Sequence, residues 1–75
     1  MLKLKIATMA TDINGDDVFL QTGTQISGIT EAGAIVTASN AEVFVNCKVH
    51  HPGQMGMDEI VSIDAVELLK ALEGV

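Results

Sequence analysis

The sequence predicts a mostly β fold of the α+β class. Five to six short antiparallel strands form a small barrel or curled sheet, for which an SH3-like barrel is one option, with one C-terminal amphipathic helix. Three observations lead to this expectation. Eight Val, seven Ile and six Thr make up 21 of the 75 residues, and β-branched side chains favour a pleated sheet. Glycine and asparagine cut the middle of the chain into strand-sized pieces. A helical apolar period occurs near the C-terminus.

The N-terminal segment predicts a β-hairpin. Apolar and basic residues alternate along the expected first strand, Leu2, Lys3, Leu4, Lys5 and Ile6, which is typical of a strand with one apolar face. The alternation is lost over residues 7–10, where a bulge or a fully covered end of the strand is expected. The segment Asp12–Asp17 contains Asn-Gly, which favours a tight turn. Val18–Thr22 is then the returning strand.

Turn residues divide the middle of the chain at Gly23, Gly28, Gly33 and Asn40. The expected strands between them are Gln25–Thr30, Ala34–Ala38 and Ala41–Val49. The last is the clearest strand in the protein because it alternates strictly. Its apolar face carries Val43, Val45, Cys47 and Val49, and its other face carries Glu42, Phe44, Asn46 and Lys48.

A loop, His50–Asp58, follows this strand because proline and two glycines make regular structure unfavourable there. Glu59–Ile63 is expected to form the last strand. Asp64, with Glu67 three residues later, has the spacing of a helix N-cap and capping box. The apolar face of the predicted helix carries Ala65, Leu68, Leu69 and Leu72, and Gly74 stands where a C-terminal cap is expected.

Composition limits the architecture to one domain, residues 1–75, with a formal net charge of −6 and no arginine. A domain this small buries only about 60–65% of the surface of its unfolded chain. A single cysteine, Cys47, excludes an intrachain disulfide. Small domains are commonly stabilised by disulfides, by a structural metal or by self-association. Two histidines and one cysteine are too few for a four-ligand zinc site in one chain, so a homo-oligomer is predicted. No targeting signal or membrane span is recognisable, and a soluble, cytoplasmic protein is expected.

Two weak metal patterns occur. Asp12, Asn14 and Asp16 alternate as at the start of a calcium loop, but the later glycine and glutamate of that motif are missing. A polar hairpin turn is therefore the preferred interpretation. Cys47, His50 and His51 could supply metal ligands, with Asp58 or Glu59 adding an oxygen. Cys47 belongs to the apolar face of its strand, and the histidines are expected to be exposed, so no metal or cofactor is predicted.

The sequence does not predict an enzyme. The one thiol is expected in the core, whereas a nucleophilic cysteine needs an accessible, electropositive setting. No serine stands in a Gly-x-Ser-x-Gly context, and the evenly spaced glycines are not followed by the lysine of a phosphate-binding loop. Direct nucleic-acid binding is disfavoured by the acidic charge and by the absence of Arg, Trp and Tyr.

The expected partners are a second copy of the chain and a basic protein, because an acidic surface attracts basic ones. The candidate interaction residues lie in one loop: His50, His51, Met55, Met57 and Asp58. Methionine is common at adaptable binding surfaces. Two interpretations of this loop stay open, an interface that contacts a partner and a lid whose methionines fold back over the end of the sheet.

The function expected from these features is that of a non-enzymatic, acidic, protein-binding module acting as a homo-oligomer. In size, charge and lack of catalytic residues the chain resembles the small accessory and inhibitor proteins of phages and mobile elements. This likeness is one of general character and rests on no motif. Two alternatives remain, a self-assembling component of a ring, tail or shell, and an oligomeric small-ligand binder.

Overall fold

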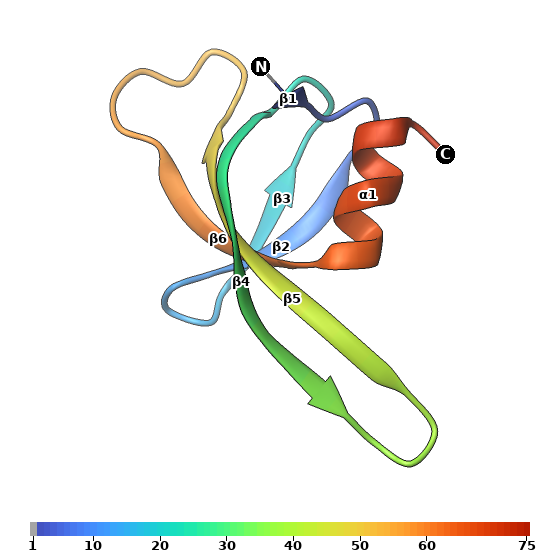
Figure 1. The fold of residues 1–75 in the computed structure, drawn as a ribbon. Coiled ribbons are helices and arrows are strands. Elements are labelled where there is room, and N and C mark those ends of the chain that lie inside the picture. The colour runs from blue at the N-terminus through green and yellow to red at the C-terminus, as the bar shows by residue number, and fades with distance from the viewer. Residues whose placement is uncertain (1) are drawn as a thin grey trace.

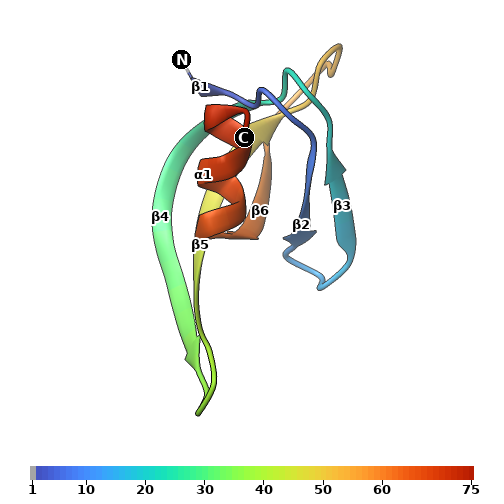
Figure 2. The same ribbon diagram turned by 90° about the vertical axis from the view of Figure 1, so that its right-hand side faces the viewer.

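A computed structural model describes residues 2–75 and confirms the fold class (Figure 1). Six antiparallel strands form one curled, half-barrel sheet in the order β1-β4-β5-β6-β2-β3, followed by one C-terminal helix. The elements are β1 (Leu2–Lys3), β2 (Thr8–Asp12), β3 (Asp17–Leu20), β4 (Gln25–Val36), β5 (Ala41–His50), β6 (Glu59–Asp64) and α1 (Ala65–Glu73). The sheet curls around α1, which lies on its concave side (Figure 2).

The core lies between this concave face and the helix. It is aliphatic and small, as the composition requires, and consists of Leu4, Ala10, Leu20, Ile26, Cys47, Val49, Val61, Ile63, Leu68 and Ala71. The helix packs against β2, β5 and β6 and contributes Leu68 and Ala71. The predicted alternation of β5 is confirmed where the helix covers it, because Cys47 and Val49 are buried and Lys48 is exposed.

The two longest strands, β4 and β5, extend well beyond the helix as a two-stranded ribbon (Figure 1). Strand β6 pairs with β5 only from Phe44 to Val49. Over residues 32–43, which we call the arm, β4 and β5 pair only with each other among the described residues. The arm gives the molecule its elongated shape, with extents of 42 × 28 × 19 Å.

Strand β4 corrects the prediction that two separate strands, Gln25–Thr30 and Ala34–Ala38, occupy this region. It is continuous over twelve residues. The glycines that were expected to end strands instead lie at irregularities within one strand, where the register with β5 shifts between Ser27 and Thr30 and again between Glu31 and Gly33. Gly28 has φ +57°, a left-handed conformation that suits glycine in a bulge.

The N-terminal strand is shorter than predicted. Only Leu2 and Lys3 pair with β4, and Leu4 is buried while Ile6 is 39% exposed, so the predicted apolar face does not form. The backbone leaves the sheet because other partners bind it. The Leu4 N–H donates to the Thr24 carbonyl (2.9 Å), and the Lys5 N–H donates to the carbonyl of Ala71 in the last turn of α1 (2.8 Å).

The residues that follow form a regular strand, β2, without the predicted bulge. Because Met9 is 52% exposed, a fully covered strand end does not occur there either. The turn between β2 and β3 is confirmed. Its carbonyl at Asp12 accepts from the Gly15 N–H (3.1 Å). Gly15 has φ +86°, whereas no non-glycine residue among residues 2–75 has positive φ. Asn14 therefore does not take part in a two-residue primed turn, and β3 begins at Asp17 and ends at Leu20, two residues before the predicted end.

The helix begins and ends where predicted. The Asp64 carboxylate accepts from the N–H groups of Val66 (2.9 Å) and Glu67 (3.2 Å), and Gly74 caps the C-terminus in the left-handed conformation. The predicted apolar face is partly wrong, because Leu69 is 57% exposed. The buried stripe is centred on Leu68 and includes Ala71, one helical turn later.

Candidate functional site

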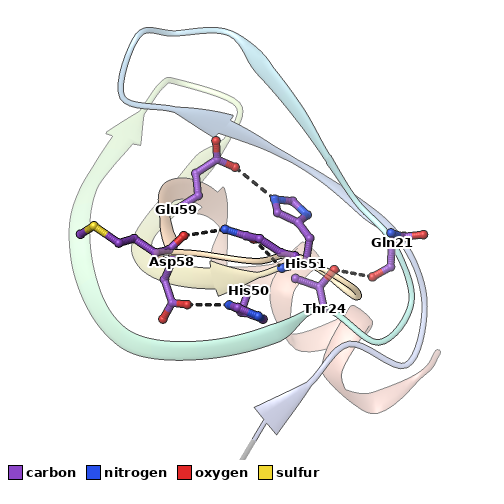
Figure 3. Close-up of polar contacts among 8 residues, drawn as sticks. Gln21, Thr24, His50, His51, Asp58 and Glu59 are labelled. Carbon is purple, nitrogen blue, oxygen red and sulfur yellow. Dashed lines mark hydrogen bonds and ion pairs between the residues drawn. The ribbon is translucent and has the colours of Figure 1, made fainter.

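Two histidine–carboxylate pairs join the ends of the loop between β5 and β6 (Figure 3). His50 Nδ1 lies 2.9 Å from Asp58 Oδ1, and His51 Nε2 lies 3.2 Å from Glu59 Oε1. The histidines are therefore not freely exposed as expected, since their side chains are only 33% and 27% accessible. Partly exposed pairs of this kind contribute up to about 1 kcal/mol each. They hold the loop closed at its base.

Gln54 organises the interior of this loop, a role that the sequence analysis missed. Its Oε1 accepts from the His51 N–H (2.9 Å), and its Nε2 donates to the Met57 carbonyl. The backbone turn below it is closed by a bond from the Gln54 N–H to the His51 carbonyl (3.0 Å). Pro52 followed by Gly53 at φ +77° is the pattern of a type II turn. The Pro-Gly dipeptide therefore indicates this turn in the sequence, but not the side-chain bonds of Gln54.

The two methionines of the loop extend into solvent. Met55 is 95% exposed and Met57 is 90% exposed. In the single chain neither side chain folds back over the end of the sheet. The loop therefore presents two adaptable thioether side chains on a backbone fixed by Gln54 and by the two histidine–carboxylate pairs.

The structure separates the weak metal candidates. Cys47 faces the core with 1% exposure, and burial raises the pKa of its thiol. His50 lies on the opposite face of β5, because it is an odd number of residues away. Among residues 2–75, no group of three or more His, Cys, Asp or Glu side chains is placed to hold a metal ion.

The calcium-like segment is a polar turn, as preferred. Asp12 Oδ1 accepts from the backbone N–H of Asn14 (2.9 Å) and of Asp16 (3.0 Å). Aspartate commonly stabilises turns in this way, by accepting hydrogen bonds from backbone N–H groups a few residues later in the chain. The Asp12 carboxylate is thus used by the hairpin it begins.

Shallow depressions surround the loop. One of them has a volume of about 220 Å³ and is lined by Gln25, Ile26, Ser27, His50 and Asp58. It is smaller than the roughly 300–1,000 Å³ typical of small-molecule sites. A broader hollow on the other side of Asp58 includes Lys48, Met57 and Ile60 and, at about 440 Å³, falls within that range.

The convex face of the sheet, opposite the helix, carries a cross-strand pair of large apolar side chains. Met9 of β2 lies directly opposite Phe19 of β3, and they are 52% and 62% exposed. Ile60 of β6 is 49% exposed on its strand. Phe19 is one of only two aromatic residues in the chain, and it lies on the surface.

The arm exposes more apolar surface. The core-facing side of β5 continues past the helix, so exposure along it rises from 0% at Val49 and 1% at Cys47 to 45% at Val43. On β4, Ile35 is 55% and Val36 is 76% exposed. Seven of the twelve arm residues are Ala, Val or Ile, and Glu42 is the only charged one. This surface was not predicted, because two short strands in place of β4 would not form a long ribbon with β5.

Comparisons of the chain with protein-family models, with curated proteins and with solved structures found no match. Within residues 2–75, the helix α1 is too short to cross a bilayer, and no other helix occurs.

Proposed function

We propose that this protein is a non-enzymatic, protein-binding module that acts as a homo-oligomer. The apolar arm is the observation that carries the proposal. A two-stranded ribbon is marginally stable at best in water. This one exposes Ile35, Val36 and Val43, and within residues 2–75 no third strand pairs with either edge of residues 32–43. Contact with another protein chain would cover these side chains and stabilise the ribbon.

Charge supports a basic partner in addition to a second copy. The formal net charge is −6, and the four lysines lie outside the arm, at positions 3, 5, 48 and 70. A basic partner would be attracted by an acidic molecule of this kind and would be released by salt. Such behaviour suits an accessory or inhibitor protein like those of phages and mobile elements.

Self-association is tested by light scattering coupled to size-exclusion chromatography. We expect the wild-type protein to be an oligomer and Val36→Lys, at a residue that is 76% exposed on β4, to shift it to the monomer with an unchanged circular dichroism spectrum. Ile13→Lys is the matched control, because Ile13 is an 82% exposed aliphatic residue in the β2–β3 turn. It should leave the oligomer intact. A wild-type protein that stays monomeric at millimolar concentration would overturn the proposal of self-association.

Partner binding is tested separately, with the immobilised wild-type protein and a cell lysate. A stoichiometric basic protein should be retained at low salt and eluted between about 0.1 and 0.5 M salt, where exposed charges are screened. The identified partner should then bind the purified protein directly in a titration. Retention of nothing across this range would count against the basic-partner part of the proposal.

A second candidate function is a self-assembling component of a larger ring or shell. It is favoured by the Met9–Phe19 pair, which lies on strands distant from the arm in the sheet. Closed rings are built from head-to-tail contacts, in which one patch of each subunit binds a different patch of the next. Two separate apolar surfaces on one chain could serve as these two patches. A large, defined assembly in light scattering, dispersed by Phe19→Lys, would favour this function over a simple binding module.

A further inference from the structure

We propose that the exposed edge of β4 in the arm pairs with the same edge of a second copy, antiparallel and around a two-fold axis. The occupant of the arm surface is thus another molecule of this chain. The inference rests on the self-association proposed above and specifies which strand carries it.

The edge is long and open. On the side of β4 away from β5, β1 pairs only with Gln25 and Ile26. From Ser27 to Val36 no described strand pairs with that side. An edge of this length is a template for another chain unless it is guarded, often by lysine or proline. The segment contains neither, and Glu31 is its only charged residue. Its two irregularities lie before Gly33, and from Gly33 to Val36 the register with β5 is regular.

The orientation of the backbone groups at this edge follows from the end of the hairpin. The Thr37 N–H donates to the Asn40 carbonyl at 2.7 Å, so this pair is a hydrogen-bonded one. In an antiparallel ladder hydrogen-bonded and non-hydrogen-bonded pairs alternate, and the register between Gly33 and Val36 is regular. Ile35 therefore exchanges bonds with β5, whereas the N–H and C=O groups of Ala34 and Val36 point to the open edge.

Side chains at the same edge favour a second copy over an unrelated strand. Antiparallel pairing around a two-fold axis places equivalent residues on the same face. Ala34 and Val36 lie opposite Val43 and Ala41 of β5, on the face that continues the core. Two arms paired in this way form a four-stranded sheet whose core-side surface is apolar from one subunit to the other.

The exposed area agrees with a missing partner. A compact monomer of 7.9 kDa exposes about 4,400 Å², whereas this chain exposes 4908 Å². The excess is about 500 Å² per chain. A standard interface removes roughly 800 Å² from each partner. The excess exposed by the whole chain is therefore more than half of the area that each partner of a standard interface buries.

The first experiment removes one edge-facing donor from the arm. Ala34→Pro deletes an N–H that β5 does not use, and Ala34→Ser is the matched control that keeps it. We expect Ala34→Pro to weaken dimerisation at least tenfold in analytical ultracentrifugation, since the two-fold axis repeats the loss in both chains. Ala34→Ser should stay within about twofold of wild type.

The second experiment does not depend on how proline is tolerated. One additional cysteine is placed in turn at Ala32, Ala34, Ile35 and Val36, and the proteins are oxidised under native conditions. The native Cys47 is buried, and the wild-type protein, oxidised in the same way, is the control for it. Two identical residues move apart by about 6.8 Å for each step from the axis, and a disulfide needs Cα atoms within about 7 Å. We expect efficient cross-linking at one position or two adjacent ones, and little at the others.

Failure of this inference and failure of the proposed function are distinguishable. A wild-type protein that is monomeric in ultracentrifugation overturns both. A wild-type dimer that Ala34→Pro leaves intact, with no cross-linking maximum along β4, overturns the edge pairing and leaves self-association through another surface standing.

Discussion

The protonation of the Cys47 thiol depends on the face of β5 on which this side chain lies. Cys47 occupies the core face of β5 between Val45 and Val49, and its exposure is 1%. Burial disfavours the thiolate, which raises the pKa of the Cys47 thiol above its ordinary value of 9.0. The sequence pattern predicted this position correctly, because period-two alternation over Val43–Val49 is a local property of one strand.

The raised pKa of Cys47 has a consequence for stability at alkaline pH. As pH rises through 9.0, the unfolded chain loses the thiol proton while the folded chain keeps it. The free energy of unfolding should therefore be highest with respect to this group below pH 9 and should fall above it. Urea unfolding of wild type and Cys47→Ala between pH 8 and 10.5 measures this. Cys47→Ala should be less stable overall with a shallower alkaline decline, and parallel curves would contradict the assignment.

Asp64 is the residue on which the helix N-terminus depends. Asp64→Ala removes the acceptor of the Val66 and Glu67 N–H groups. We expect a loss of about 1 kcal/mol, which corresponds to a fall in Tm of about 4–8 °C for a domain of this size. Differential scanning calorimetry provides the measurement. Glu67→Gln is the control and should change Tm little, because the side chain of Glu67 makes only an exposed contact with Lys70 at 3.8 Å.

At the scale of elements, β4 depends on a glycine at its first irregularity. A Cβ at Gly28 would meet Lys48 side-chain carbons no closer than 3.6 Å, so space does not forbid alanine. The φ of +57° instead disfavours alanine, because the left-handed conformation is unfavourable for a residue with a Cβ atom. Gly28→Ala should therefore lower the free energy of unfolding by about 1–2 kcal/mol. Gly28→Asn should cost less, since asparagine tolerates the left-handed region. Equal losses for the two variants in urea unfolding would contradict this origin.

The same element shows where sequence reasoning stops. The helix ends and the β5 alternation were predictable because caps and periodicity involve residues close in the sequence. A glycine within a strand and a glycine between strands have the same local pattern, so the continuity of β4 depends on its pairing with β5. Leu4 and Lys5 were likewise placed in a longer strand, because their hydrogen-bond partners, Thr24 for Leu4 and Ala71 for Lys5, are distant in sequence.

The loop between β5 and β6 was only partly predictable for the same reason. Its position in the chain was predictable from Pro52 and the two glycines that follow it. The pairing of His50 with Asp58 and of His51 with Glu59 requires the antiparallel approach of β5 and β6, which brings residues eight apart together. Gln54 acts through side-chain bonds to the backbone, for which a glutamine in a loop gives no specific pattern.

At the scale of the whole molecule, dimerisation through the arm should couple stability to concentration. Association stabilises the folded state by mass action. For about 150 residues in a dimer, each tenfold rise in protein concentration should raise Tm by about 3–6 °C. Scanning calorimetry from 5 to 500 µM measures the slope. Val36→Lys, which places a charge on the pairing edge of β4, should show a Tm that does not change with concentration, and a flat wild-type curve would contradict the dimer.

The bond between the Lys5 N–H and the Ala71 carbonyl also bears on the order of folding. It joins residues 66 positions apart, and most of the sheet lies in the chain between them. Closing so long a loop has a large entropic cost until the intervening strands are already paired. The N-terminal segment should therefore dock late, after the helix has settled in the curve of the sheet. Refolding on the millisecond-to-second scale, typical of topologies rich in distant contacts, is the expected kinetic signature of this fold.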